Sequence, residues 1–106
     1  MRRALIVILF FAAILLPTLA NAAKGAVVYN KTGCDYYIVE TISGYALLEW
    51  FGGNDPNEGD ILVGDYESYG TKDIYNITAD AETMVWVEEF WLSKKRVIEK
   101  YFQKCN

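Results

Sequence analysis

The stretch CDYYIVETISGYALLEWF, residues 34–51, carries the clearest secondary-structure signal in the 106-residue sequence. Its two halves are rich in β-branched and aromatic residues, which fit the pleated surface of a strand. The dipeptide SG at positions 43 and 44 separates the halves, and a two-residue turn fixes the register of a hairpin. The stretch therefore predicts a β-hairpin in which Val39 faces Leu48 and Tyr37 faces Trp50.

Side chains along the predicted hairpin alternate between two faces. One face has no charged residue and is predicted to be core. Its members are Tyr37, Val39, Thr41, Ala46, Leu48 and Trp50. The other face includes Glu40 and Glu49, so we expect it to be wetter. Its aromatic residues are Tyr36, Tyr45 and Phe51.

Further strands are predicted downstream of the hairpin. Residues 60–66, 72–78 and 83–90 contain DILVGDY, KDIYNIT and TMVWVEEF, which are rich in strand-forming residues. For residues 83–92 the alternative of one long helix that begins at Asp80 stays open, although Val, Trp and Phe favour a strand. Residues 26–29, AVVY, are a candidate short strand within the lead-in. Ser93 is predicted to be the N-cap of a C-terminal helix. The apolar stripe of this helix consists of Val97, Ile98, Tyr101, Phe102 and Cys105.

Together these elements predict a mainly β fold, a small five-stranded barrel with a C-terminal helix packed on it. The barrel is expected to be SH3-like or OB-like. Short strands with internal glycines such as Gly64 bend easily, and closure into a barrel leaves no exposed edge. A single domain is expected to span residues 23–106, a length suited to one small core.

Residues 1–22, MRRALIVILFFAAILLPTLANA, have the features of a secretory signal peptide. Two arginines precede an apolar run at residues 4–16, and the tripeptide ANA at positions 20–22 supplies small residues before a cleavage site. The run is shorter than the roughly 20 apolar residues that a membrane-spanning helix needs. We therefore expect an exported bacterial protein, periplasmic or secreted, without a stable membrane anchor after cleavage.

The charge balance and the absence of histidine restrict the function. Cleavage after Ala22 would leave 8 basic and 14 acidic residues, a net charge of −6. Such a domain repels phosphate backbones, so nucleic acid is not an expected partner. The sequence contains no histidine, which excludes His-based catalytic triads and the common zinc motifs. We expect no cofactor and no metal site, and an enzyme is not the favoured class.

Two cysteines, Cys34 and Cys105, are predicted to form a disulfide, because paired cysteines in an exported protein are usually oxidised. The disulfide would fasten the C-terminal helix to the start of the first hairpin strand. In the chain-entropy model, closing a loop of this size stabilises a fold by about 4 kcal/mol.

The stretch EWFGGNDPNEGD, residues 49–60, ends in an acidic loop with strong turn-forming residues. Its carboxylates are Asp55, Glu58 and Asp60. Oxygen-rich loops can bind Ca²⁺, but the spacing here does not match an EF-hand loop. We interpret the loop as a solvated turn at the edge of a binding surface.

Aromatic residues are the best functional signal, since Phe, Tyr and Trp make up 14 of the 84 residues after position 22. Core packing does not obviously account for all of them, including Tyr66, Tyr69 and Trp91 at loop edges. Exposed Tyr and Trp are favoured at protein interfaces. We therefore predict a binding protein that contacts an envelope protein or peptide. Its predicted binding residues are Tyr36, Tyr45, Phe51, Asp55, Glu58 and Asp60.

Two alternative functions use the same hairpin. A carbohydrate or cell-wall ligand could stack on its exposed aromatic residues. A small hydrolase could use Glu40 and Glu49, because the predicted register places them diagonally, about 7 Å apart. That separation lies within the range of acid/base carboxylate pairs.

Overall fold

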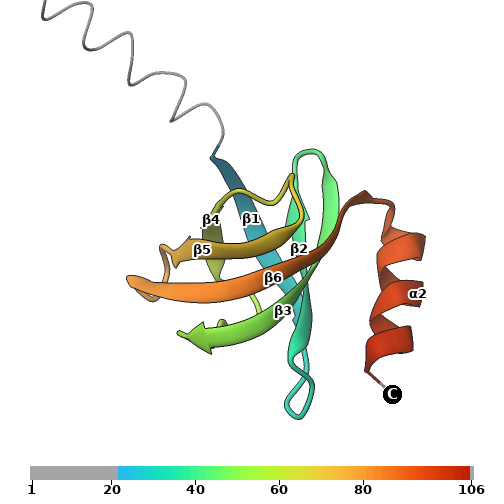
Figure 1. Cartoon of the computed structure of the whole chain (residues 1–106), viewed down its shortest axis with the longest axis horizontal. Helices are drawn as coiled ribbons and strands as arrows, with labels where there is room; N and C mark the ends of the chain where they lie inside the picture. The colour runs from blue at the N-terminus through green and yellow to red at the C-terminus, as the bar shows by residue number, and fades with distance from the viewer. Residues whose placement is uncertain (1–21, 106) are drawn as a thin grey trace, which may run out of the picture.

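The computed structural model describes residues 22–105, which form a six-stranded antiparallel barrel and one helix (Figure 1). The predicted signal peptide lies outside the described residues except for Ala22. Within the described range, no helix has the length and apolar character needed to cross a membrane. The elements are β1 (Ala23–Asn30), β2 (Tyr36–Thr41), β3 (Gly44–Gly53), β4 (Ile61–Gly64), β5 (Gly70–Asn76), β6 (Ala81–Leu92) and α2 (Lys94–Lys104).

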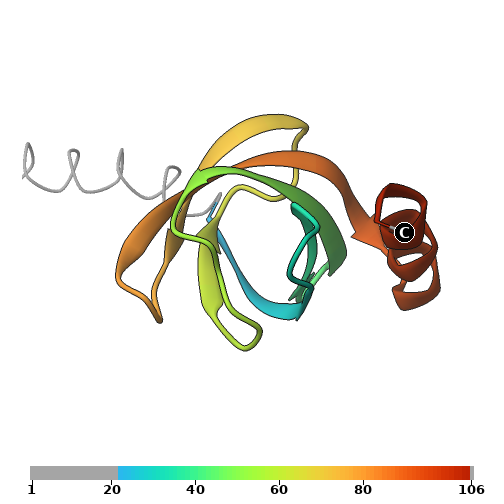
Figure 2. The ribbon, with the colours of Figure 1, turned by 90° about the horizontal axis from the view of Figure 1, so that it is seen from below.

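The strand order around the barrel is β1-β2-β3-β6-β5-β4, and pairing of β1 with β4 closes it. Figure 2 shows the strands arranged in a ring with α2 on the outside. The predicted barrel, C-terminal helix and disulfide are confirmed, but the predicted number of five strands is wrong. The expected lead-in is a full strand that pairs with both β2 and β4. A bulge at Val28 interrupts its alternation, which is why its sequence suggested only a short strand.

The hairpin forms as predicted, but its register is shifted by two residues. The observed partners are Thr41 with Gly44, Glu40 with Tyr45 and Tyr37 with Leu48. Thr41 closes the turn earlier than expected, because its hydroxyl donates to the Gly44 carbonyl (2.9 Å) and accepts from the Ser43 N–H (3.2 Å). Since a shift of two preserves the side-chain alternation, the predicted core face still points inward.

The barrel interior is the main hydrophobic core. It is built from Val27, Tyr37, Val39, Ala46, Leu48, Leu62, Tyr66, Ile74, Val85 and Val87, with Trp50 packed at its edge. Trp50 is paired with Val85 rather than with Tyr37. Tyr66, expected at a loop edge, is a core residue instead. Burial raises the pKa of both Tyr37 and Tyr66 well above the ordinary tyrosine value, so both side chains stay protonated.

A second, smaller core lies between α2 and the outside of the hairpin. Ile38 and Leu47 pack there against Val97 and Tyr101. Ser93 is the N-cap, as predicted, and its hydroxyl accepts from the Arg96 N–H at 3.2 Å. The middle of the face predicted to be wetter is therefore covered by the helix.

Electrostatic and covalent contacts complete the attachment of α2. Lys100 pairs with Glu89 at 3.1 Å and Lys104 with Glu88 at 3.6 Å. The disulfide joins Cys34 to Cys105 with the two Cα atoms 5.9 Å apart. Since exposed ion pairs contribute little, we attribute the attachment mainly to the second core and the disulfide.

Replacing both cysteines, as Cys34→Ala/Cys105→Ala, should lower the free energy of unfolding by about 4 kcal/mol, because the unfolded chain regains the entropy of an open loop. Urea denaturation of the oxidised domain and of the variant measures the difference. Wild-type protein under reducing conditions should match the variant. Equal urea midpoints for the oxidised wild type and the variant would show that the disulfide does not stabilise the fold.

Candidate binding surfaces

The three predicted binding aromatics do not form one patch. Tyr36 and Tyr45 lie beside α2, whereas Phe51 stands near the far end of β3 with 51 % of its surface exposed. Tyr36 and Tyr45 line two different grooves along the helix, with volumes of about 560 and 420 Å³. Of the three, Phe51 is the most exposed, whereas Tyr36 and Tyr45 are partly buried.

Tyr36 and Tyr45 already have polar partners within the domain. The Lys104 ammonium lies 5.7 Å from the centre of the Tyr36 ring, a cation–π arrangement. The Tyr45 hydroxyl donates to Glu40 at 3.1 Å. Partial burial, reinforced by neighbouring Glu49 for Tyr36 and by Glu40 for Tyr45, raises the pKa of both phenols. These two tyrosines therefore contribute to the packing of α2, which sequence patterns alone could not show.

The acidic loop is tied into the barrel rather than presented as a ligand site. Asp60 is only 8 % exposed, and its carboxylate accepts from the Asn57 N–H (3.0 Å) and from the buried Asn76 amide (2.9 Å). The Glu58 carboxylate accepts from the Asn30 N–H at 2.9 Å. Of the three predicted acidic residues, Asp55 is the one with an exposed side chain and no hydrogen bond among the described contacts.

The observed register removes the geometric basis of a Glu40/Glu49 catalytic pair. Glu40 is opposite Tyr45, and Glu49 is opposite Tyr36. The two glutamates are therefore separated by four residues along the hairpin, roughly 13 Å at strand spacing. Carboxylate pairs in glycoside hydrolases lie about 5–9.5 Å apart. The predicted diagonal contact is wrong because the turn closes at Thr41.

Phe51 belongs to a surface that sequence analysis did not assemble. Met84 and Trp86 point outward from β6 between the buried Thr83, Val85 and Val87, and are 43 % and 36 % exposed. The register places Met84 beside Gly52, next to Phe51. The sequence TMVWVEE, residues 83–89, already indicated this arrangement, because side chains two residues apart on a strand, such as Met84 and Trp86, share one face. We call Phe51, Met84 and Trp86, with their acidic neighbours Glu49, Asp73 and Glu82, the outer sheet face.

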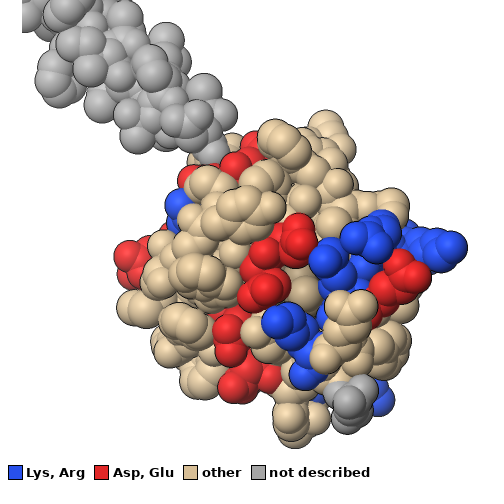
Figure 3. All heavy atoms as spheres, turned by 45° about the vertical axis from the view of Figure 1, so that its right-hand side comes forward, with Lys and Arg blue, Asp and Glu red and all other residues tan. Residues whose placement is uncertain are grey.

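The acidic neighbours of this face have no basic partners in the described part of the chain. Register pairs Glu49 with Trp86 and Asp73 with Met84, and Glu82 precedes Thr83 on the same strand. None of the three takes part in an ion pair among residues 22–105. Figure 3 shows a band of acidic side chains beside a cluster of basic ones, with mostly uncharged surface and a few further charged side chains on the other side of the band.

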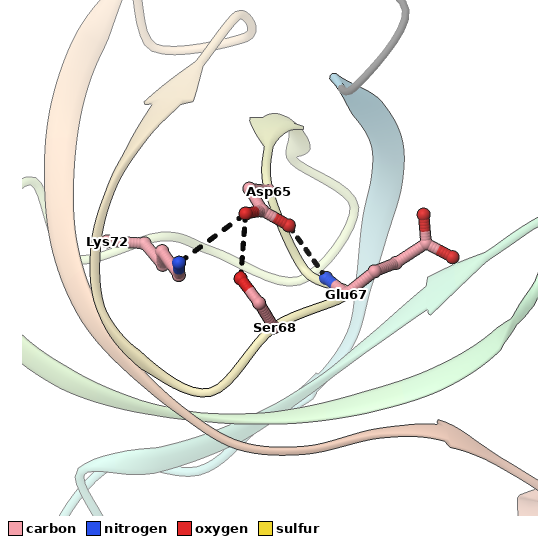
Figure 4. Close-up of polar contacts among 4 residues, drawn as sticks. All are labelled: Asp65, Glu67, Ser68 and Lys72. Atoms are coloured by element: carbon pink, nitrogen blue, oxygen red, sulfur yellow. Dashed lines mark hydrogen bonds and ion pairs between the residues drawn. The ribbon is translucent and has the colours of Figure 1, made fainter.

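A polar network orders the loop between β4 and β5 (Figure 4). The Asp65 carboxylate accepts from the Ser68 hydroxyl (2.8 Å), the Glu67 N–H (3.0 Å) and the Lys72 ammonium (3.4 Å). Partial burial would raise the pKa of Asp65, but these hydrogen bonds and the Lys72 charge outweigh burial and lower it. The loop thus depends on an ionised Asp65.

Residues 22–105 contain no group of three or more His, Cys, Asp or Glu side chains placed to hold a metal ion. Comparison with known proteins adds no functional information. No protein-family model, no curated protein and no solved structure matches this chain. Its function must therefore be inferred from the chemistry of its surfaces.

Asp60→Ala should destabilise the domain by about 2 kcal/mol, because it removes the acceptor of two hydrogen bonds at a buried site. Asp55→Ala is the matched control from the same loop and should change stability by less than about 0.5 kcal/mol. Thermal or urea unfolding of both variants provides the comparison. Equal effects would contradict the structural role given to Asp60.

Asp65→Asn should lower stability at neutral pH and have little effect in acid. A lowered pKa in the folded state stabilises the fold above the ordinary aspartate pKa of about 3.9, and the contribution disappears as pH falls through the folded value. The melting temperatures of wild type and variant, measured from pH 7 to pH 3, should converge at low pH. Asp73→Asn controls for net charge. A gap that persists unchanged at pH 3 would contradict the assignment.

Proposed function

We propose that this chain is an exported interaction protein that binds a basic, partly apolar segment of an envelope protein or peptide through the outer sheet face. The observation that carries the proposal is the exposure of Phe51, Met84 and Trp86 together on adjacent strands. Aromatic residues and Met are enriched at protein interfaces, and Trp is among the commonest hot-spot residues.

Charge supports a basic partner. Glu49, Asp73 and Glu82 border the apolar side chains and have no ion-pair partner among the described residues. The expected net charge of −6 after cleavage adds long-range attraction for a cationic molecule. Complementary charge raises the association rate and excludes acidic competitors.

Barrel closure indicates how the partner would be recognised. Every strand from β1 to β6 has a neighbour on each side in the ring. A partner strand therefore finds little free sheet edge to extend, which is the mode that many peptide-binding domains use. The exception is residues 70–74 of β5, which pair with β6 but not with β4. Recognition through side chains on the outer sheet face remains, and it favours a compact or helical segment over an added strand.

The direct test is the affinity of the oxidised domain, residues 23–106, for a synthetic amphipathic Lys/Leu peptide, measured by calorimetry. Phe51→Ser and Trp86→Ser should each weaken binding about tenfold, as loss of an interface anchor does. Added salt should also weaken binding, because the acidic neighbours are exposed to solvent.

Ile42→Ser is the matched control, since Ile42 is fully exposed at the hairpin turn, remote from Phe51 along β3. It should leave the affinity unchanged. An equal loss in this control would mean that binding is unspecific. Binding of a neutral cell-wall oligosaccharide in place of the peptide would refute the proposal in favour of a carbohydrate ligand.

A further inference from the structure

A second group of exposed aromatic residues lies where β6 ends. Tyr69 and Trp91 each expose 63 % of their surface. Both rings pack on Phe90, with centroid separations of 4.9 and 5.0 Å. Phe90 is partly buried against the barrel core, so it forms a base from which the two exposed rings project. Core packing thus accounts for Phe90 but not for the other two.

Of the two exposed rings, that of Trp91 is held in position by its backbone and by a hydrogen bond. Trp91 has a φ of 57°, a left-handed backbone conformation that is rare and strained for a bulky residue. Its indole N–H donates to the Glu67 carboxylate. Glu67 in turn lies in the loop that Asp65 orders through the Glu67 N–H and the Ser68 hydroxyl. A ring fixed in this way loses little entropy on binding a ligand.

The electrostatics of this group favour a cation. The Glu67 carboxylate is exposed at the edge of the indole, and within residues 22–105 it forms no ion pair. Trp is the aromatic side chain that attracts cations most strongly. The Lys104 ammonium makes such a cation–π contact with the Tyr36 ring, whereas no basic side chain of the described region lies over Tyr69 or Trp91.

We infer that Glu67, Tyr69 and Trp91 form a binding site for an arginine side chain of a peptide or protein partner. A planar guanidinium can stack on an exposed ring and donate hydrogen bonds to a carboxylate at the same time. A quaternary ammonium could use the rings but has no proton to donate to Glu67. The site shares no residue with the outer sheet face and can be tested without the partner proposed for that face.

The test is a titration of the ¹⁵N-labelled oxidised domain with the peptide acetyl-Gly-Arg-Gly-amide, followed by NMR. Trp50, Trp86 and Trp91 provide three indole signals in one spectrum. The Trp91 signal should shift in a saturable way with a dissociation constant on the order of millimolar, as expected for one exposed cation–π contact with a carboxylate. The Trp50 indole, whose N–H donates to the Asn54 carbonyl, should not shift.

Variants separate charge from packing. Glu67→Gln keeps an oxygen that can accept the indole N–H but loses the negative charge, and it should weaken binding about fivefold. Tyr69→Ala should have a similar effect. Tyr75→Ala, which removes another exposed tyrosine from the β5 region, should have none.

Ligand controls define the chemistry of the site. Acetyl-Gly-Gly-Gly-amide should not bind, and tetramethylammonium should bind about fivefold more weakly than the arginine peptide because it cannot hydrogen-bond to Glu67. No saturable shift at about 100 mM peptide, far above a millimolar dissociation constant, would overturn the assignment. Equal binding by Glu67→Gln, by tetramethylammonium or by N-acetylglucosamine would overturn it as well.

Discussion

Burial of the β2–β3 hairpin on both of its faces is the constraint on which the rest of the structure depends. Its inner side chains fill the barrel, while Ile38 and Leu47 on the outside are covered by α2. This second contact fixes where the helix packs, and the disulfide between Cys34 and Cys105 fastens the helix end to the hairpin. The aromatic residues near α2 become packing elements. Phe51 on the far end of β3 and Trp86 and Trp91 on β6 are left exposed, and these are the residues that we propose for binding.

Alternation in the sequence was sufficient to predict much of this fold. The uncharged face of the hairpin proved to be the barrel core, and Ser93 proved to cap the helix, because period-two burial and N-capping are local properties. The hairpin register was mispredicted because the Thr41 hydroxyl selected a different turn. That two-residue difference left the faces unchanged but separated Glu40 from Glu49. The conformation of one turn therefore removed the geometric basis for a catalytic pair of these two glutamates.

The candidate site was harder to predict, since it depends on contacts between distant segments. Asp60 seemed available in an acidic loop, yet Asn76 on β5 binds its carboxylate. Tyr36 and Tyr45 seemed exposed because nothing in the hairpin sequence shows where α2 will pack. Trp86 could have been found from alternation in β6. The position of Trp91 could not, because it depends on a left-handed backbone and on the hydrogen bond that its indole N–H donates to Glu67.

Hydroxyl-radical footprinting tests most directly the claim that packing under α2 and binding use different aromatic residues. In the free domain, Phe51 and Trp91 should be oxidised rapidly, whereas Tyr37, Tyr66 and Tyr101 in the two cores should be protected. Addition of the basic amphipathic peptide should protect Phe51 and leave the labelling of Tyr36 and Tyr45 unchanged. Protection of Tyr36 and Tyr45 with no change at Phe51 would contradict the account and place binding in the grooves beside α2.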